Sequence, residues 1–138
     1  MSRDIAPVTI VTGAGSGMGA AVARRMAPVA ASLLLCDLDE AQLRKGWAAA
    51  GSEVETAFLG GDVSNPDFKV RLEDALAGRA VAGLVHCAGL SATMADPARI
   101  LSVNLVSVHK HGVFGVDGAF ARNLDRLRLS ILGLAGRY

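Results

Sequence analysis

Short apolar runs alternate along the chain with segments in which apolar residues recur at helical spacing. The runs have the length of buried strands and lie at 8–12, 33–37, 54–59 and 82–87. The segments between them that predict helices lie at 18–29, 39–50 and 66–77. The second and third of these helices are preceded by Asp, Ser or Asn residues that can cap a helix. This alternation predicts right-handed βαβ units, with helices on both faces of a parallel sheet.

Four glycines follow the first predicted strand, at Gly13, Gly15, Gly17 and Gly19, and a helix pattern starts among them. Glycine lets a backbone turn tightly and lets a ligand approach closely. The start of a helix presents unpaired N–H groups and a partial positive charge. Strand, bare loop and helix start together predict a seat for a phosphate group, and so a nucleotide site. A flexible surface turn is the alternative, and the flanking strand and helix weigh against it.

Composition narrows the class of protein further. The chain has 138 residues, which fits one domain, and 51% of them are hydrophobic, which indicates a globular protein. A net charge of +1 gives no case for a nucleic-acid or membrane-surface partner. Cys36 and Cys87 lie in apolar runs, where reduced, core-packing thiols are expected. We expect a cytoplasmic protein, since neither a signal peptide nor a spanning stretch is visible.

The chain changes character near Val106. Residues 1–106 hold 9 Lys and Arg against 11 Asp and Glu, whereas residues 107–138 hold 5 against 2. Three glycines between 112 and 118 interrupt the helix expected after Pro97, each at a cost of about 1 kcal/mol. The second region is therefore predicted to be divergent or irregular. His109 and His111 are two residues apart and point apart on a helix, so no metal site is predicted.

The glycine loop fits a longer motif than the common G-x-G-x-x-G, whose third glycine would fall on Met18. The spacing that fits is T-G-x-x-x-G-x-G, with Thr12, Gly13, Gly17 and Gly19. In this motif the chain resembles the short-chain dehydrogenase/reductase family over about residues 5–106. The resemblance implies a Rossmann-type, doubly wound α/β sheet of about five strands in the order 3-2-1-4-5. It also implies a nicotinamide dinucleotide as the cofactor.

Asp37 ends the second predicted strand, where a carboxylate can accept both hydroxyls of an adenosine ribose and repels a 2′-phosphate. No Arg or Lys follows it directly, and Ser16 stands at a loop position that is often basic in NADP-using relatives. NAD is therefore favoured over NADP. A helix cap for 39–50 is the alternative role of Asp37, and one residue could serve both.

Two further segments resemble cofactor contacts of the family. Asp62 and Val63 match the Asp-Val pair that holds adenine, although Asp62 could instead cap the helix at 65–77. Cys87, Ala88 and Gly89 stand where the family has Asn-Ala-Gly, and the missing asparagine puts local bracing of the sheet in doubt. The predicted cofactor contacts are Gly13, Ser16, Gly17, Met18, Gly19, Asp37, Asp62, Val63, Cys87, Ala88 and Gly89.

The catalytic part of the resemblance is incomplete. Asn104 resembles the helix asparagine that distorts its helix and positions a water in the proton relay, with a packed amide as the alternative. Ser130 is a candidate for the serine that holds the substrate oxygen, and a plain strand serine is equally consistent. The family uses a Tyr-x-x-x-Lys pair to move the alcohol proton. Tyr138 is the only tyrosine and has no residue four positions on, so this pair is absent from the sequence.

The chain thus looks like the front half of a family member, without the last two strands, the substrate loop and the catalytic helix. The first hypothesis is an NAD-dependent oxidoreductase that interconverts a secondary alcohol and a ketone, close to the hydroxysteroid and secondary-alcohol branch. As this chain it would turn over little, and it would act as a homo-oligomer or with a completing chain. A non-catalytic NAD-binding module is the second hypothesis. A truncated or frame-shifted product is the third.

Overall fold

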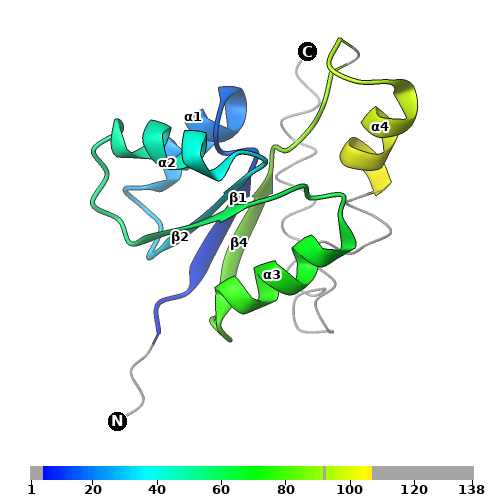
Figure 1. The fold of residues 1–138 in the computed structure, drawn as a ribbon. Coiled ribbons are helices and arrows are strands. Elements are labelled where there is room, and N and C mark those ends of the chain that lie inside the picture. The colour runs from blue at the N-terminus through cyan, green and yellow to red at the C-terminus, as the bar shows by residue number, and fades with distance from the viewer. Residues whose placement is uncertain (1–4, 92, 107–138) are drawn as a thin grey trace.

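Four parallel strands form the centre of the computed structural model, which describes residues 5–91 and 93–106 (Figure 1). The strands are β1 (Val8–Thr12), β2 (Leu33–Asp37), β3 (Thr56–Gly60) and β4 (Val81–His86). Their order across the sheet is β3-β2-β1-β4, and each neighbouring pair runs parallel. The predicted doubly wound sheet is confirmed. The fifth predicted strand lies outside the described residues.

Helices cover both faces of the sheet (Figure 1). They are α1 (Gly17–Met26), α2 (Glu40–Ala48), α3 (Pro66–Leu76) and α4 (Pro97–Leu101), followed by a π-helical turn, η1 (Ser102–Val106). Ala23 of α1 and Leu43 of α2 pack on one face, whereas Phe68 of α3 packs on the other. None of the helices in the described ranges is long and apolar enough to cross a membrane.

The core consists of two apolar clusters, one on each side of β1 and β2. Ile10 and Leu34 belong to the cluster under α3, and Val11 and Leu35 belong to the cluster under α1 and α2. These strands are apolar at successive positions because both of their faces are covered, as is usual in a parallel sheet. Cys36 is fully buried in the first cluster, as predicted. The pKa of the Cys36 thiol is raised to about 12, mainly because the thiol is buried and to a lesser degree because Asp37 beside it is negatively charged.

The element boundaries differ from the prediction by one to three residues at the helix ends and the two later strands. β3 begins at Thr56 because Val54, the first apolar residue of the predicted run, lies in a turn where its N–H bonds Ser52 Oγ. After Pro97 the chain keeps α-helical geometry only as far as Leu101. Residues 107–138, with their predicted irregularity, lie outside the described residues.

Arg79 joins four segments at the amino end of the sheet. Its side chain is 14% exposed, and its guanidinium donates to Ala6 O through both Nε and Nη2. The same guanidinium donates to Ser32 Oγ and to Glu55 Oε1. Ser32 Oγ donates in turn to Pro7 O. These bonds connect the segment before β1 with the starts of β2, β3 and β4.

Candidate functional site

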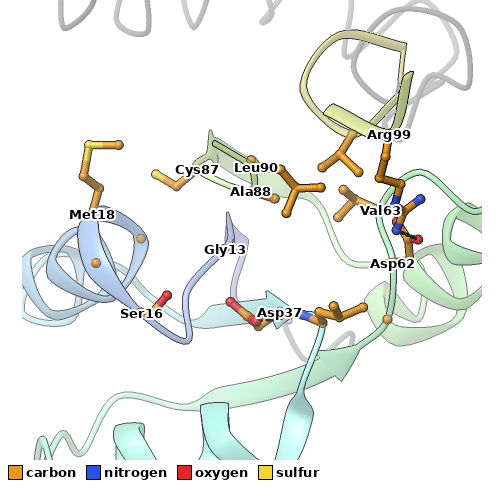
Figure 2. A pocket seen from close by; sticks show the side chains of 16 residues that line it. Gly13, Ser16, Met18, Asp37, Asp62, Val63, Cys87, Ala88, Leu90 and Arg99 are labelled. Atoms are coloured by element: carbon orange, nitrogen blue, oxygen red, sulfur yellow. Dashed lines mark hydrogen bonds and ion pairs between the residues drawn. The ribbon is translucent and has the colours of Figure 1, made fainter. Parts of the chain in front are cut away.

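A cleft of about 320 Å³ lies at the carboxyl ends of the strands (Figure 2). The loops that follow β1, β2, β3 and β4 meet there, as expected where the strand order reverses in an open α/β sheet. Every cofactor contact predicted from the sequence lines this cleft. The other lining residues are Leu38, Gly61, Leu90, Arg99 and Val103. The fold thus brings together predicted residues that lie up to 76 positions apart in the sequence, as Gly13 and Gly89 do.

The glycine loop runs against the end of β4 with no room for side chains. Gly13 has φ of +66°, and a Cβ added there would lie 2.7 Å from the backbone N of Ala88. A Cβ on Gly19 would collide with the carbonyl of Gly13, so α1 packs directly on the loop. Gly17 also has a positive φ, of +52°, but a Cβ there would meet nothing within 4 Å. The loop therefore keeps its inner side closely packed and its outer side open.

The four α-helices of the described region begin in two different ways. Asp39, Asn65 and Asp96 each accept a hydrogen bond from the first turn of α2, α3 and α4, respectively. Ser16, which precedes α1, makes no such bond with its side chain. The N–H groups at the start of α1 thus have no side-chain cap, and they border the cleft. The alternative roles of Asp37 and Asp62 as helix caps are wrong, since Asp39 and Asn65 cap those helices.

Asp37 is fixed at the end of β2 by two backbone N–H groups. Its Oδ2 accepts from Gly15 N at 2.8 Å, and its Oδ1 accepts from Leu38 N at 2.8 Å. A Cβ on Gly15 would lie 2.8 Å from the Asp37 carboxyl carbon, so a glycine is required beneath this carboxylate. Each carboxylate oxygen keeps a lone pair for another donor. Asp37 is thus a pre-oriented acceptor for a pair of hydroxyls.

Asp62 lies on the loop after β3, where Ser64 and Arg99 surround its carboxylate. Its Oδ1 accepts from both the N–H and the Oγ–H of Ser64, at 2.9 Å and 2.6 Å. Its Oδ2 forms an ion pair with Nη2 of Arg99. Partial burial raises the pKa of Asp62, but the hydrogen bonds from Ser64 and Arg99 outweigh it and hold the pKa below its usual value. Asp62 is therefore an ionised acceptor at neutral pH.

Thr12 braces the ends of β1 and β4, where the family's asparagine is replaced by Cys87. Thr12 Oγ1 accepts from the N–H groups of Cys87 and Ala88, at 3.2 Å and 3.3 Å. The N–H of Cys87 is shared with Thr12 O, at 3.1 Å, and Thr12 Oγ1 also forms a hydrogen bond with His86 Nδ1 at 2.8 Å. The other ring nitrogen of His86, Nε2, is buried and has no hydrogen-bond partner among the described residues.

The prediction of a core position for Cys87 is wrong. β4 ends at His86, so Cys87 lies just beyond the strand, half-buried and at the edge of the cleft. Burial raises the pKa of the Cys87 thiol, which keeps it protonated at neutral pH. No group of three or more His, Cys, Asp or Glu side chains suited to a metal ion occurs in the ranges 5–91 and 93–106.

Asn104 lies in the π-helical turn η1 and binds both backbone groups of one residue. Its Oδ1 accepts from Leu90 N at 2.7 Å, and its Nδ2 donates to Leu90 O at 2.8 Å. The helix is thus distorted where the resemblance places a distorting asparagine, and the amide connects η1 to the loop after β4. Its role in a proton relay stays a prediction. Ser130 and Tyr138 lie outside the described residues.

Arg99 is the charged residue of the cleft lining that the sequence prediction missed. It comes from α4 and reaches Asp62 and Ser64, which lie 37 and 35 positions earlier in the chain. A single arginine in a short helix has no local pattern that distinguishes it from a solvated surface charge. Its place in the cleft depends on how the chain folds.

Comparison with known proteins gives the family. A sequence model described as short chain dehydrogenase matches residues 7–125. The (3R)-3-hydroxyacyl-CoA dehydrogenase of Canis lupus familiaris is 34% identical over 135 residues, covering 85% of this chain and 50% of the relative. The chain belongs to the short-chain dehydrogenase family, as the glycine motif predicted.

Solved structures agree with this family. A variant of actinorhodin polyketide ketoreductase with NADPH matches with a TM-score of 0.70 and 27% identity, over 88% of this chain and 51% of that one. A short chain dehydrogenase from Mycobacterium smegmatis matches with a TM-score of 0.63 and 28% identity, over 76% of this chain and 48% of that one. The chain thus spans about half the length of the relatives it matches.

Proposed function

We propose that this chain forms the NAD-binding half of a short-chain dehydrogenase that interconverts a secondary alcohol and a ketone. The observation that carries the proposal is the Asp37 carboxylate, fixed by Gly15 and Leu38 beside the uncapped start of α1. An acceptor for two ribose hydroxyls thus lies next to donors for a pyrophosphate. A relative that is a (3R)-3-hydroxyacyl-CoA dehydrogenase supports an alcohol substrate.

The shape of the cleft fits a dinucleotide. Backbone packs so closely around Gly13 and Gly19 that side chains there would clash, while the space beside Gly17 is open. A phosphate can therefore approach the N–H groups at the start of α1. Asp62, Val63, Ala88 and Gly89 all line the cleft. Adenine would lie beside Asp62 and Val63, and the backbone of Ala88 and Gly89 would run beside the cofactor. Bound there, the nicotinamide ring would accept or supply the hydride.

Asp37 supports NAD rather than NADP as the cofactor. Two relatives were solved with NADPH or NADP, so the family accommodates both dinucleotides. A 2′-phosphate on this adenosine ribose would lie against a fixed carboxylate, and no Arg or Lys follows Asp37 directly to neutralise it. Leu38, the residue that follows, is 69% exposed and offers no charge.

We do not expect the 138-residue chain to catalyse the reaction alone. Asn104 and Ser130 are the candidate catalytic residues, but the sequence contains no Tyr-x-x-x-Lys pair to move the alcohol proton. Turnover would then require a completing chain or a longer protein. We further propose that the protein is cytoplasmic and that it forms a homo-oligomer or pairs with a completing chain. A non-catalytic NAD-binding module is the second candidate, favoured by the same missing pair.

The test is calorimetric titration of the chain with NAD and NADP, for the wild type and for Asp37→Asn. We expect NAD to bind at least about tenfold more tightly than NADP, because a fixed charge repels the 2′-phosphate. Asp37→Asn keeps an acceptor oxygen and removes the charge, so it should reduce the preference to about twofold. Asp39→Asn is the matched control: asparagine caps a helix as well as aspartate, so the preference should not change.

Each possible outcome of the titration and of an activity assay bears on a different part of the proposal. A wild-type chain that is folded but binds neither dinucleotide would refute the proposal. Equal affinity for NAD and NADP would refute the choice of NAD alone. Ketone reduction by the chain by itself, at rates of a complete enzyme, would refute the assignment of catalysis to further residues. A chain that binds NAD but shows no turnover, even when candidate completing chains are added, would favour the non-catalytic module.

A further inference from the structure

Arg99 lines the cleft beside Asp62, and the contact joins α4 to the loop after β3 (Figure 2). Asp96 caps α4 by accepting from Arg99 N at 3.0 Å, which fixes where the arginine side chain starts. The guanidinium then donates through Nη1 to Ser64 Oγ at 2.9 Å and through Nη2 to Asp62 Oδ2. The Ser64 hydroxyl donates a hydrogen bond to Asp62 Oδ1. The donors and acceptors of this network are mutually consistent.

Counting lone pairs shows what remains open at Asp62. Oδ1 accepts from Ser64 N and Ser64 Oγ, so both of its lone pairs are engaged. Oδ2 accepts from Arg99 alone among the described residues, so one lone pair remains for a ligand. The ring of donors also fixes the plane of the carboxylate. Asp62, which lines the cleft, therefore keeps one acceptor position open.

We propose that Arg99 is a positioning residue for base recognition, because it holds Asp62 with a single acceptor directed at an exocyclic amino group such as that of adenine. The inference rests on the proposed function, which places the adenine of NAD at this end. An amino group donates to that acceptor, whereas a carbonyl oxygen at the same position of the base would be repelled. The selectivity is thus for 6-amino over 6-oxo purines.

The alternative is that Arg99 only fastens α4 to the loop after β3. In that case its loss would loosen the cleft and weaken every dinucleotide to the same degree. A second contact, between Asn104 and Leu90, independently holds the adjoining turn η1 to the loop after β4. Because of it, we expect α4 to stay near the cleft when Arg99 is replaced. The ratio of affinities for two bases then separates the two roles.

The experiment titrates the 138-residue chain with NAD and with nicotinamide hypoxanthine dinucleotide, in which a carbonyl oxygen replaces the amino group. We expect the wild type to prefer NAD by about tenfold or more, as for one hydrogen bond to a charged group. In Arg99→Met the carboxylate loses its anchor, and the preference should fall to about twofold. Arg99→Lys keeps the charge without the second donor arm and should restore part of the preference.

Arg44→Met is the matched control, since Arg44 also pairs with a carboxylate, Glu40, but does not line the cleft. It should leave the preference unchanged. Equal loss of affinity for both dinucleotides in Arg99→Met would overturn the inference, and so would tighter NAD binding, which would mean that Arg99 competes with adenine. A wild type that binds NAD without discriminating between the bases would also overturn it. A wild type that binds no dinucleotide would instead refute the proposed function.

Discussion

The two ends of the sheet treat their polar groups in opposite ways. At the amino end, Arg79 donates to Ala6, Ser32 and Glu55, so that charged and backbone groups satisfy one another within the chain. At the carboxyl end, the start of α1 has no side-chain cap, and Asp37 keeps acceptors open to the cleft. The comparison indicates that the amino end of the strands serves the stability of the fold, whereas the carboxyl end is left open for a ligand. Substitutions at one end should therefore leave the other unaffected.

The largest effect is expected from Arg79→Met. The substitution leaves the carbonyl of Ala6 and the hydroxyl of Ser32 without their charged donor, which should lower the free energy of unfolding by about 2 kcal/mol. Urea unfolding would measure this, with Arg44→Met as a control expected to lose less than about 1 kcal/mol. The affinity for NAD should stay within twofold of the wild type. A large loss of affinity in folded Arg79→Met would contradict the separation of the two ends.

Ser16→Asp should move stability and binding in opposite directions. A carboxylate before α1 can cap the helix and interact with its dipole, which should raise the free energy of unfolding by about 0.5 kcal/mol. The same charge would repel the pyrophosphate, so calorimetry should show about tenfold weaker NAD binding. Ser16→Asn, which is neutral and of the same size, should keep the gain in stability without that repulsion. Equal binding by both variants would show that no phosphate lies there.

The smallest effect concerns His86, the unsatisfied group at the carboxyl end. Burial lowers the pKa of His86, so the unfolded chain binds a proton more readily than the folded one. The free energy of unfolding should thus be highest above the unfolded pKa of about 6.5 and fall as the pH is lowered from there toward the folded pKa. Thermal unfolding between about pH 7 and about pH 5 would measure it. His86→Asn keeps an acceptor for Thr12 and should flatten the profile, whereas an unchanged slope would assign it to other groups.

Much of the fold could be predicted from the sequence because it depends on local pattern. β1 and β2 were predicted with their observed bounds, since each is a short run of β-branched or apolar residues that is followed by a glycine or ends at an aspartate. The start of β3 was predicted two residues early, because apolarity alone does not distinguish Val54 in a turn from a residue in the strand.

The candidate site divides in the same way. The glycine loop, Asp37 and Asp62 follow motif spacing and were found from the sequence. Arg99 was not, because its partners lie far away in the chain and no local pattern marks it. The bracing by Thr12 was also missed, since it depends on a hydroxyl that reaches across from β1 to the backbone after β4.

The hydrogen bond from Gly15 N to Asp37 Oδ2 has a consequence for cofactor engineering. Removing the carboxylate, as in Asp37→Ala, does more than abolish a repulsive charge. It also releases the Gly15 N–H, which under the proposed function would face a 2′-phosphate on the adenosine ribose. Because the glycine beneath leaves no side chain in the way, a redesigned pocket would gain its first phosphate contact from the backbone. An added arginine would then strengthen an existing anion site and would not have to create one.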